Sequence, residues 1–354
     1  MIEASNATPL RVVQWTTGNV GREAVATILS DPRLELVGVF AHDPAKVGRD
    51  AADLCGLDKP TGVTATADVD ALLALRPDCV VFTALTLDVD QVAQILRAGI
   101  NVVTTSEFLT GTHAGPEATA TLQEAALAGG STLFGSGVNP GFLQPFAGLC
   151  AGLSREVRSI SVTESADVTM FAADPNFASV GWGRRPGDPG HVEALQASTT
   201  LFSDSLDVLS ALVGLTLDER RCTVELAHAT EDLDIPGMVI PKGHVAGLDL
   251  RWEGLVGGTV RLTIRQRWVI GDRTEPSWPV EFGYVIEVEG DPNVRVKFDM
   301  WPDGDLATMG KDDFRALGMR ITAVPTVNAI PTVCAAPPGI QTYATLPMIT
   351  THMG

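Results

Sequence analysis

The chain has 354 residues, of which 45% are hydrophobic and 19% charged, and its formal net charge is -18. This balance is typical of a globular protein with a sizeable core, and so acidic a surface argues against nucleic acid and membranes as partners. The five cysteines are widely spaced without a C-x-x-C pair, so we expect no disulfide framework and no metal site. The sequence shows no signal-like N-terminus and no apolar run near the roughly 20 residues of a membrane span, so we expect a cytoplasmic protein.

Residues 11–135 alternate between short apolar segments and helical ones. Strands are predicted at 11–15, 34–40, 78–84, 101–105 and 131–137, and helices at 22–30, 68–75, 88–99 and 116–130. Asp68 is a suitable N-cap for the second of these helices, and Gly99 a suitable C-cap for the third. Strands that alternate with helices of this length predict a doubly wound parallel sheet. We therefore expect an α/β fold with an N-terminal Rossmann domain over residues 1–150.

The pattern changes after about residue 150. Residues 156–168, 220–230, 245–270, 281–290 and 294–302 read as long alternating strands, 191–214 as one long helix, and 181–190 as a loop. This order predicts a C-terminal α+β domain on a mixed or antiparallel open sheet, over residues 151–311. Residues 312–354 begin with a largely helical stretch that contains prolines at 325 and 331. We expect this last segment to return to the first domain.

The first strand and the first helix are joined by "WTTGNVGREA" (15–24). Gly18 and Gly21 stand where the last two glycines of a G-x-G-x-x-G fingerprint belong, and Thr16 stands in the first position. The second glycine lets the backbone approach a pyrophosphate, and the third lets the helix pack on the strand. The helix N-terminus and Arg22 would then face the phosphates. The alternative is an ordinary strand–turn–helix, but its place at the head of an α/β unit favours nucleotide binding.

The second predicted strand ends in "VFAHDPAKVGRDA" (39–51), where a Rossmann domain contacts the adenosine ribose. An acid such as Asp43 favours NAD, whereas the cations His42, Lys46 and Arg49 would hold the 2′-phosphate of NADP. The alternative for the cations is a solvated loop. The sequence is therefore compatible with both NADP and NAD.

Further candidates follow the later strands, at the edge of the sheet where ligands bind in such folds. Thr83, Ala84 and Leu85 follow the strand at 78–84, and Asn139 and Pro140 follow the strand at 131–137. Asn139-Pro140-Gly141 is alternatively a simple inter-domain turn. The full set of predicted cofactor-binding residues is Thr17, Gly18, Asn19, Val20, Gly21, Arg22, His42, Asp43, Lys46, Arg49, Thr83, Ala84, Leu85, Thr104, Ser106, Asn139 and Asn328.

Glu107 leaves the strand at 101–105 in "NVVTTSEFL". A glutamate here is either a helix N-terminal residue, favoured by the macrodipole, or a group that acts on substrate in the same crevice. Aromatic neighbours predict an apolar wall, and a carboxylate in such a place favours a cationic partner such as a substrate ammonium or iminium. The predicted substrate-pocket residues are Phe108, Pro140, Phe142, Phe146, Met170, Phe171 and Phe177.

Four segments carry a resemblance to a known family. They are "QWTTGNVG", "LELVGVFAHDPAKVGRDA", "NVVTTSEFL" and "GSGVNPGF". A fifth segment, "TVNAIPTVCAAPPGI" (326–340), has a weaker resemblance to the same family. The chain resembles the dihydrodipicolinate-reductase-like proteins of the 2,4-diaminopentanoate dehydrogenase and native amine dehydrogenase group. The resemblance is strongest over residues 10–146, and "TTSEFL" is its most specific part.

The resemblance implies a Rossmann domain, a C-terminal domain that completes the substrate pocket and the dimer, and a homodimer. It implies NAD(P)H-dependent reductive amination of a small ketone or aldehyde with ammonia, with Glu107 as the catalytic residue. Thr16 replaces the first glycine of the fingerprint, a change that the group tolerates, and the chain lacks the His-His, Lys and Ser-Gly-Thr pocket of true dihydrodipicolinate reductases. Three alternatives remain: a dehydrogenase of an amino acid, diamine or hydroxy compound, a non-catalytic NADP-binding sensor, and a structural protein, which the crevice at the strand ends disfavours.

Overall fold

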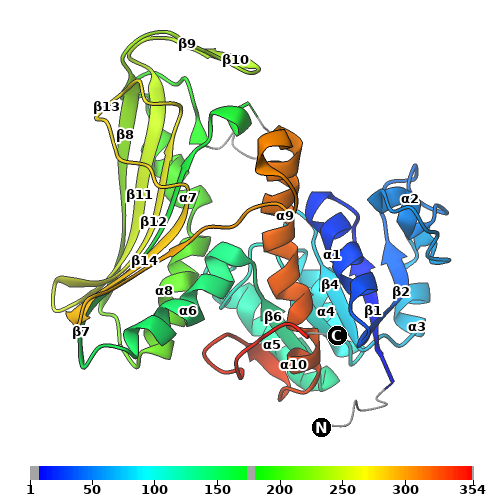
Figure 1. The fold of residues 1–354 in the computed structure, drawn as a ribbon. Coiled ribbons are helices and arrows are strands. Elements are labelled where there is room, and N and C mark those ends of the chain that lie inside the picture. The colour runs from blue at the N-terminus through cyan, green and yellow to red at the C-terminus, as the bar shows by residue number, and fades with distance from the viewer. Residues whose placement is uncertain (1–7, 174–179, 353–354) are drawn as a thin grey trace. The chain divides into compact units, whose positions relative to one another are not determined.

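A computed structural model describes residues 8–173 and 180–352 of the chain (Figure 1). The chain divides into two compact units. Unit 1 comprises Met1–Phe142 and Ala307–Gly354, and unit 2 comprises Leu143–Leu306. The sequence places the corresponding boundaries near residues 150 and 311.

The described part of unit 1 contains a seven-stranded parallel sheet in the order β16-β6-β5-β4-β1-β2-β3. Its strands are β1 (Leu10–Trp15), β2 (Leu34–Phe40), β3 (Ala65–Thr66), β4 (Cys79–Phe82), β5 (Asn101–Thr104), β6 (Thr132–Gly135) and β16 (Gly339–Gln341). Its helices are α1 (Asn19–Ser30), α2 (Ala51–Cys55), α3 (Val69–Ala74), α4 (Val89–Arg97), α5 (Pro116–Gly129), α9 (Lys311–Asn328) and α10 (Ile330–Cys334). The turn η1 (Val138–Phe142) follows β6 and has non-helical backbone at Asn139, Pro140 and Gly141. This confirms the predicted doubly wound parallel sheet.

Aspartate side chains fix where α2, α3 and α4 begin. The Asp68 carboxylate accepts a hydrogen bond from the Ala71 backbone N–H at 2.9 Å, as its position before α3 predicts. Asp88 caps α4 in the same way through Gln91, at 3.0 Å. Each carboxylate satisfies an N–H group that has no partner within the helix.

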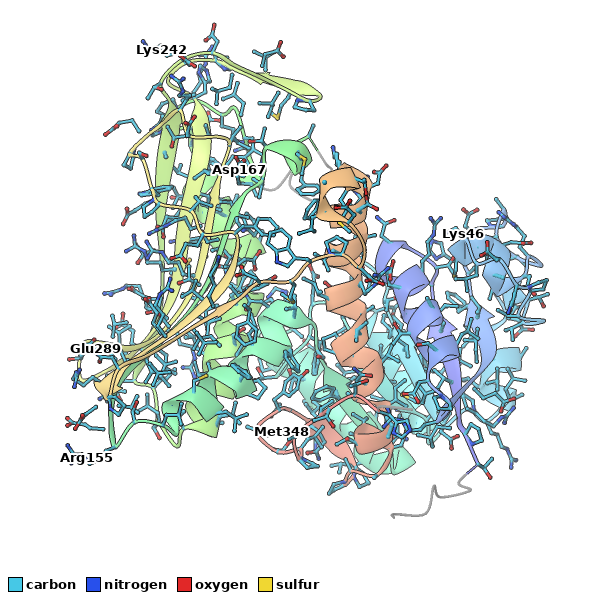
Figure 2. All side chains as sticks on the ribbon, in the orientation of Figure 1. Lys46, Arg155, Asp167, Lys242, Glu289 and Met348 are labelled. Atoms are coloured by element: carbon cyan, nitrogen blue, oxygen red, sulfur yellow. The ribbon has the colours of Figure 1, made fainter. Side chains whose placement is uncertain are left out.

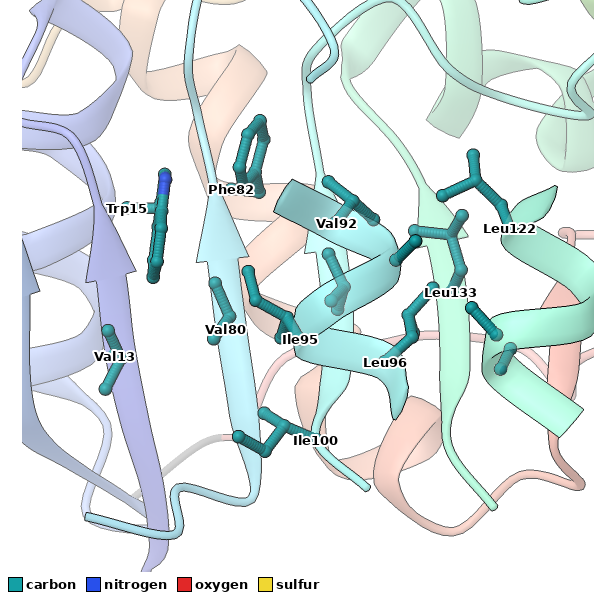
Figure 3. Packing of buried hydrophobic residues seen from close by; sticks show 14 of the residues in the cluster. Val13, Trp15, Val80, Phe82, Val92, Ile95, Leu96, Ile100, Leu122 and Leu133 are labelled. Carbon is teal, nitrogen blue, oxygen red and sulfur yellow. The ribbon is translucent and has the colours of Figure 1, made fainter. Parts of the chain in front are cut away.

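The core of unit 1 lies between the parallel strands and the helices that cover them (Figure 3). Trp15 of β1 stacks on Phe40 of β2, with ring centroids 4.2 Å apart. Every residue of β4 is buried, because parallel strands are covered on both faces and therefore read as continuous apolar runs. This core holds the strand ends that carry the candidate site.

Unit 2 contains, in its described part, a seven-stranded mixed sheet in the order β13-β8-β11-β12-β7-β14-β15. Its strands are β7 (Glu156–Asp167), β8 (Glu219–Ala229), β11 (Val245–Val256), β12 (Thr259–Val269), β13 (Thr274–Glu275), β14 (Gly283–Asp291) and β15 (Val294–Phe298), beside a hairpin of β9 (Leu233–Ile235) and β10 (Met238–Ile240). Strands β7 and β12 are parallel, and the other neighbours are antiparallel. The predicted mixed sheet is confirmed.

Helices α6 (Leu143–Ala151), α7 (His191–Ser198) and α8 (Leu201–Leu212) contact this sheet (Figure 1). The prediction of one helix over 191–214 is wrong, because α7 and α8 are separate. The break falls at two threonines whose hydroxyls donate to backbone carbonyls: Thr199 to Leu195 at 2.8 Å, and Thr200 to Ala197 at 2.9 Å. Threonine side chains that bond to the preceding turn compete with the helix and bend it.

Asp50 organises the loop that follows β2. Its Oδ1 accepts hydrogen bonds from the Ala52 N–H at 2.7 Å and the Thr61 N–H at 3.1 Å, and its Oδ2 accepts one from the Gly62 N–H at 2.8 Å. The backbone N–H groups of Thr61 and Ala52 lower the pKa of Asp50 to about 2. The carboxylate therefore holds α2 and the segment before β3 together.

We predict that Asp50→Asn destabilises unit 1 at neutral pH. A lowered folded-state pKa stabilises the fold fully above the unfolded value near 4, and this stabilisation is lost as the pH falls towards about 2. Denaturant unfolding of the parent and the variant should show a gap at pH 7 that narrows below pH 4. Asp53→Asn, in the first turn of the same helix, is the control and should change stability little. A gap that does not depend on pH would contradict the prediction.

Candidate functional site

The carboxyl ends of the parallel strands meet at one edge of unit 1. Backbone hydrogen bonds join Thr83 to Trp15, Thr105 to Phe82, and Ser136 to Thr104, at 3.2, 3.2 and 2.9 Å. The strand order reverses between β1 and β4, and such a switch point is where open α/β sheets bind ligands. The segments after β1, β4, β5 and β6 therefore border one candidate site.

The two glycines after β1 have different surroundings. A Cβ built on Gly18 would meet no protein atom within 4 Å, so the backbone there is open to a ligand. A Cβ on Gly21 would lie 2.4 Å from the Thr16 carbonyl oxygen and 2.9 Å from the Thr83 Oγ1. Gly21 thus permits the close packing of α1 on the turn, and Gly18 leaves space above it, as the fingerprint requires.

Thr16 stands where the fingerprint has its first glycine, and its φ is +73°. This left-handed conformation is unusual for a β-branched residue, so surrounding contacts must hold it. The Gln14 Nε2 donates to the Thr16 carbonyl at 3.0 Å and to the Thr83 Oγ1 at 2.7 Å. The Thr16 Oγ1 donates to the Thr83 carbonyl at 3.2 Å. Side-chain hydrogen bonds thus keep the turn in the shape that a glycine would adopt freely.

The N-terminus of α1 is suited to a dinucleotide pyrophosphate. Gly18 provides no side-chain cap, so the first N–H groups of the helix remain for an anion. The Thr17 Oγ1 is buried without a hydrogen-bond partner among the described residues. The Lys46 Nζ lies 3.5 Å from the Thr17 carbonyl oxygen and adds a positive charge beside the turn (Figure 2). The open space at Gly18, the Thr17 hydroxyl without a partner and the Lys46 ammonium together fit the phosphates of a nicotinamide dinucleotide.

The remaining residues predicted after β2 and in the first turn of α1 lie on the surface. His42, Asp43 and Arg49 are exposed, as are Asn19 and Arg22, whereas Val20 is half-buried. The Asp43 Oδ1 accepts a hydrogen bond from the Ala45 N–H at 2.9 Å and so shapes its own turn. Among the residues predicted after β2, the structure brings Lys46 to the glycine turn.

Several predicted cofactor residues use their side chains inside the protein. The Thr83 Oγ1 donates to the Trp15 carbonyl at 3.0 Å, and the Thr104 Oγ1 donates to the Phe82 carbonyl at 2.9 Å. The Ser106 Oγ donates to the Ala84 carbonyl. These side chains position the strand ends. By contrast, Leu85 is 84% exposed at the end of β4 and presents an apolar side chain at this edge.

Glu107 occupies a tight turn after β5. Its φ is +44°, its N–H donates to the Thr105 carbonyl at 3.2 Å, and its side chain is exposed. The next helix begins at Pro116, with Gly115 as its N-cap, so Glu107 is not at a helix N-terminus. Left-handed non-glycine residues concentrate at functional sites. The structure thus presents this carboxylate at the same edge as the glycine turn, in a conformation that a helix cap does not need.

The backbone on both sides of Glu107 is held tightly. The Thr104 Oγ1 accepts a hydrogen bond from the Ser106 N–H at 2.9 Å. On the other side, a Cβ on Gly135 of β6 would lie 1.8 Å from the Phe108 carbonyl oxygen. Only glycine permits β6 to approach the turn so closely, and the turn is thereby fixed between β4 and β6.

The segment after β6 contains the predicted residues Asn139 and Pro140. The Asn139-Pro140 peptide is cis, and Asn139 and Pro140 are half-buried within η1. Helix α9, which ends at Asn328, contacts η1. The C-terminal segment thus lies beside the carboxyl end of β6.

The predicted aromatic pocket residues are divided between the units. Phe108 is 3% exposed and belongs to the core of unit 1, and Phe142 is half-buried at the end of that unit. In unit 2, Phe146 packs edge-on against Phe298 with centroids 4.6 Å apart, Met170 is exposed and Phe171 is half-buried. Phe177 lies outside the described residues. The role of these residues in a substrate pocket stays a prediction.

Two residues of this edge are not among the sequence-based candidates. Gln14 is fully buried in β1, and its amide joins β1 to β4 and to the glycine turn. Tyr343, near the C-terminus, shares a 2.6 Å hydrogen bond with the Ser136 Oγ after β6. A glutamine inside an apolar strand is a signal that could have pointed to Gln14, whereas Tyr343 has no local signal.

The described residues were compared with what a metal site and a membrane span require, and they fit neither. They contain no group of three or more His, Cys, Asp or Glu side chains arranged to hold a metal ion. None of the helices in the same part of the chain is long and apolar enough to cross a membrane.

Comparison with known proteins gives matches along almost the whole chain. The family model for the dihydrodipicolinate reductase N-terminus matches residues 12–128, and that for the 2,4-diaminopentanoate dehydrogenase C-terminal domain matches residues 151–354. An amine dehydrogenase of Streptomyces virginiae is 29% identical over 358 residues, or 96% of each chain. A 2,4-diaminopentanoate dehydrogenase of Acetoanaerobium sticklandii is 24% identical over 75% of this chain and 71% of its own length. The solved structure of an amine dehydrogenase from Mycobacterium smegmatis is 26% identical, with a TM-score of 0.74 over 98% of each chain.

Fold and comparisons define the class of the protein as an NAD(P)-dependent dehydrogenase, an oxidoreductase with a Rossmann unit. The C-terminal model covers more than half of the chain, and the chain therefore belongs to the 2,4-diaminopentanoate dehydrogenase C-terminal domain family. The resemblance inferred from the sequence and the predicted fold class are both confirmed.

The contrast between the two glycines gives a matched pair of variants. We predict that Gly18→Val folds as the parent does, because the position is open and its φ is -72°, but loses most of its affinity for NADPH and NADH. Gly21→Ala should instead destabilise the fold, because its Cβ would overlap the Thr16 carbonyl. Thermal unfolding and cofactor fluorescence titration measure the two effects. Undiminished binding of both cofactors by Gly18→Val would refute the placement of the pyrophosphate.

Proposed function

We propose that the protein is an amine dehydrogenase that catalyses the reversible reductive amination of small ketones or aldehydes with ammonia to primary amines. The observation that carries the proposal is Glu107, an exposed carboxylate held in a left-handed turn at the ligand-binding edge of the Rossmann sheet. The names of the similar proteins from Streptomyces virginiae and Mycobacterium smegmatis support the same activity.

The chemistry assigned to Glu107 is proton transfer and charge stabilisation. Its carboxylate removes a proton from incoming ammonium, assists the loss of water from the carbinolamine, and stabilises the positive iminium that results. General acid–base assistance of this kind is worth about 10²–10⁴-fold in rate. When bound, the nicotinamide cofactor supplies or accepts the hydride.

The turn around Glu107 supports this role by limiting its movement. The Ser106 hydroxyl donates to Ala84, the Thr104 hydroxyl accepts from the Ser106 N–H, and Gly135 admits the Phe108 carbonyl. These contacts join the end of β5 to its two neighbours in the sheet, β4 and β6. A carboxylate on so constrained a backbone is preorganised for a reacting group.

The remaining assignments are proposals of the same kind. Unit 1 would bind NAD(P), and unit 2 would complete the substrate pocket and form a homodimer, as the family resemblance implies. The cysteines of the described residues form no disulfide, which is compatible with the cytoplasm. Both cofactors should be accepted, with Lys46 beside the glycine turn and His42 and Arg49 on the same loop.

We predict that Glu107→Gln folds and binds cofactor as the parent does but loses at least about a hundredfold in amination turnover. Glutamine keeps the shape of the side chain but cannot take up a proton or balance the charge of an iminium. Steady-state kinetics with a ketone, ammonium and NADPH measures the loss. A variant that still aminates within a few-fold of the parent rate would remove the support for this mechanism.

Glu107→Gly separates chemistry from backbone strain. Glycine adopts the positive φ of this position without the cost of about 1–2 kcal/mol that side chains incur in the left-handed region. We therefore expect Glu107→Gly to be at least as stable as Glu107→Gln in thermal unfolding and equally inactive. A clearly less stable glycine variant would show that the Glu107 side chain contributes to the fold.

Cofactor choice should depend on the charges after β2. We predict that replacing His42, Lys46 and Arg49 together by neutral residues lowers the NADP-to-NAD preference by about tenfold or more, because charge-assisted hydrogen bonds to the 2′-phosphate are lost. Replacing Lys46 alone should weaken both cofactors, since its ammonium lies beside the Thr17 carbonyl. Fluorescence titration of both cofactors tests this. If the NADP-to-NAD preference is unchanged in the triple variant, the three cations belong to a solvated loop and do not hold the 2′-phosphate.

Substrate choice distinguishes the proposal from its alternatives. We predict that small aliphatic ketones and aldehydes have a higher kcat/KM than keto acids such as pyruvate, because the Glu107 carboxylate repels a substrate carboxylate. The measurement is a panel of amines, alcohols and amino acids in oxidation, and of ketones and keto acids in amination, with each cofactor. Better turnover of alcohols, amino acids or pyruvate would favour a different dehydrogenase, and no turnover of any compound would favour an NADP-binding sensor.

A further inference from the structure

Two of the five cysteines lie together in unit 1, although they are far apart in the sequence. Cys79 begins β4, and Cys334 ends α10. The Cys334 thiol donates to the carbonyl oxygen of Asp78, the residue before Cys79, at 3.6 Å, and it contacts the Cys79 thiol. The two thiols therefore face each other, whereas the other cysteines lie apart on α2, α6 and β8: Cys55, Cys150 and Cys222.

The alternation of side chains along β4 explains why Cys79 meets α10. Val80 and Phe82 point into the core cluster that α4 covers (Figure 3), so Cys79 points to the opposite face of the sheet. Helix α10 contacts the strands β5 and β6, and Val333 beside Cys334 is fully buried. The helix is thus held against the sheet, and its last residue reaches the start of β4.

The two thiols differ in how accessible they are. Cys79 is fully buried, and burial raises its pKa well above the usual range, so it stays a neutral thiol. Cys334 is half-buried, so a small oxidant dissolved in water can reach it. Because cysteine oxidation follows exposure and thiolate character, Cys334 reacts first, and Cys79 is the thiol that its oxidised form meets.

We propose that Cys79 and Cys334 form a dithiol site that hydrogen peroxide oxidises to a disulfide between β4 and α10. In the first step, the Cys334 sulfur attacks one oxygen of the peroxide. An S–O bond forms, the O–O bond breaks, and the departing hydroxide leaves as water with the proton of the Cys334 thiol. The product is the sulfenic acid of Cys334.

In the second step, the Cys79 sulfur attacks the sulfur of the Cys334 sulfenic acid. The S–S bond forms, the S–O bond breaks, and the hydroxide leaves as water with the proton of the Cys79 thiol. Each sulfur is oxidised by one electron overall, and one peroxide is reduced to two molecules of water. A thiol reductant reverses the reaction by thiol–disulfide exchange.

The disulfide would tie the last part of the chain to the Rossmann sheet. Residues Ala307–Gly354 return to unit 1 after unit 2, and they supply α9, α10 and the edge strand β16. A bond between residues 79 and 334 closes a long loop, and such bonds restrict the unfolded chain most. Cys79 lies at the amino end of β4, away from the carboxyl ends that border the candidate site. Oxidation should therefore stabilise unit 1 and leave NADPH binding unchanged.

The test treats the full chain with hydrogen peroxide under native conditions and then blocks the remaining thiols after unfolding. Peptide mass spectrometry without reduction locates the disulfide, and thermal unfolding compares the oxidised and reduced forms. We expect a peptide that links Cys79 to Cys334 within one chain, and an unfolding temperature higher by at least about 3 °C. Dithiothreitol should reverse both. Neither readout involves a ketone or an amine, so the result does not depend on the proposed amination.

Three single variants separate this pair from the other cysteines. Cys334→Ala and Cys79→Ala should each abolish the rise in unfolding temperature that peroxide causes. Cys222→Ala removes a half-buried thiol of β8 and should keep that rise. Cys79→Ala also blocks the second step, so the Cys334 sulfenic acid should accumulate and be trapped by dimedone. Each variant is compared with its own untreated form, which removes the effect of the substitution itself on stability.

Several outcomes would overturn the proposal. They are the absence of the linked peptide, a rise in unfolding temperature that persists in Cys334→Ala, the loss of that rise in Cys222→Ala, and a dimedone adduct on Cys79 in place of Cys334. A lower unfolding temperature for the linked form would show that the bond needs a rearranged fold, and it would overturn the proposal too.

Discussion

The buried amide of Gln14 holds together the part of the Rossmann unit on which the rest of the site depends. From β1 it reaches the Thr83 hydroxyl after β4 and the carbonyl of Thr16 in the glycine turn. It thereby joins the two strands between which the sheet reverses its order and holds Thr16 in a conformation that a β-branched residue rarely adopts. Because Gly21 packs against the same groups, the direction of α1 follows from this contact. The open N-terminus of α1 then faces the space above Gly18.

In the turn that carries Glu107, buried side-chain hydrogen bonds likewise fix the backbone at the ends of β4 and β5. Hydroxyls that could have faced a ligand are turned inward, so Thr104 and Ser106 bond to the backbone of β4 and of their own turn. Polar side chains on buried strand ends cost less when they are satisfied internally, and here they also fix the backbone. The carboxylate that remains exposed is that of Glu107. The division between internal hydroxyls and an outward carboxylate explains how a short apolar strand can end in a polar turn.

Unit 2 treats its buried polar groups in two different ways. On one face of the sheet, burial acts to raise the pKa of Asp249, but hydrogen bonds and charge from Arg265, Arg251 and Arg267 outweigh it and keep the pKa low. That carboxylate is fully compensated inside the unit. On the other face, the amide of Gln266 has no partner among the described residues. The two buried groups therefore differ in how far the described residues satisfy them.

The sequence by itself determined the longer strands and most of the helices of both units, the glycine turn and the position of Glu107 at a strand end, but not short elements such as β3, β9 and β16. It could do so because strand and helix periodicities, Asp caps such as Asp68 and the spacing of Gly18 and Gly21 are local properties of the chain. It missed the break at Thr199 and Thr200, where side-chain hydrogen bonds to the preceding turn outweigh an apolar helical pattern. Only the tertiary structure decided that Thr83, Thr104 and Ser106 point inward, that Lys46 reaches the glycine turn, and that Cys334 lies beside Cys79. These facts depend on strand order, register and helix packing, which bring together residues far apart in the sequence and which no local pattern encodes.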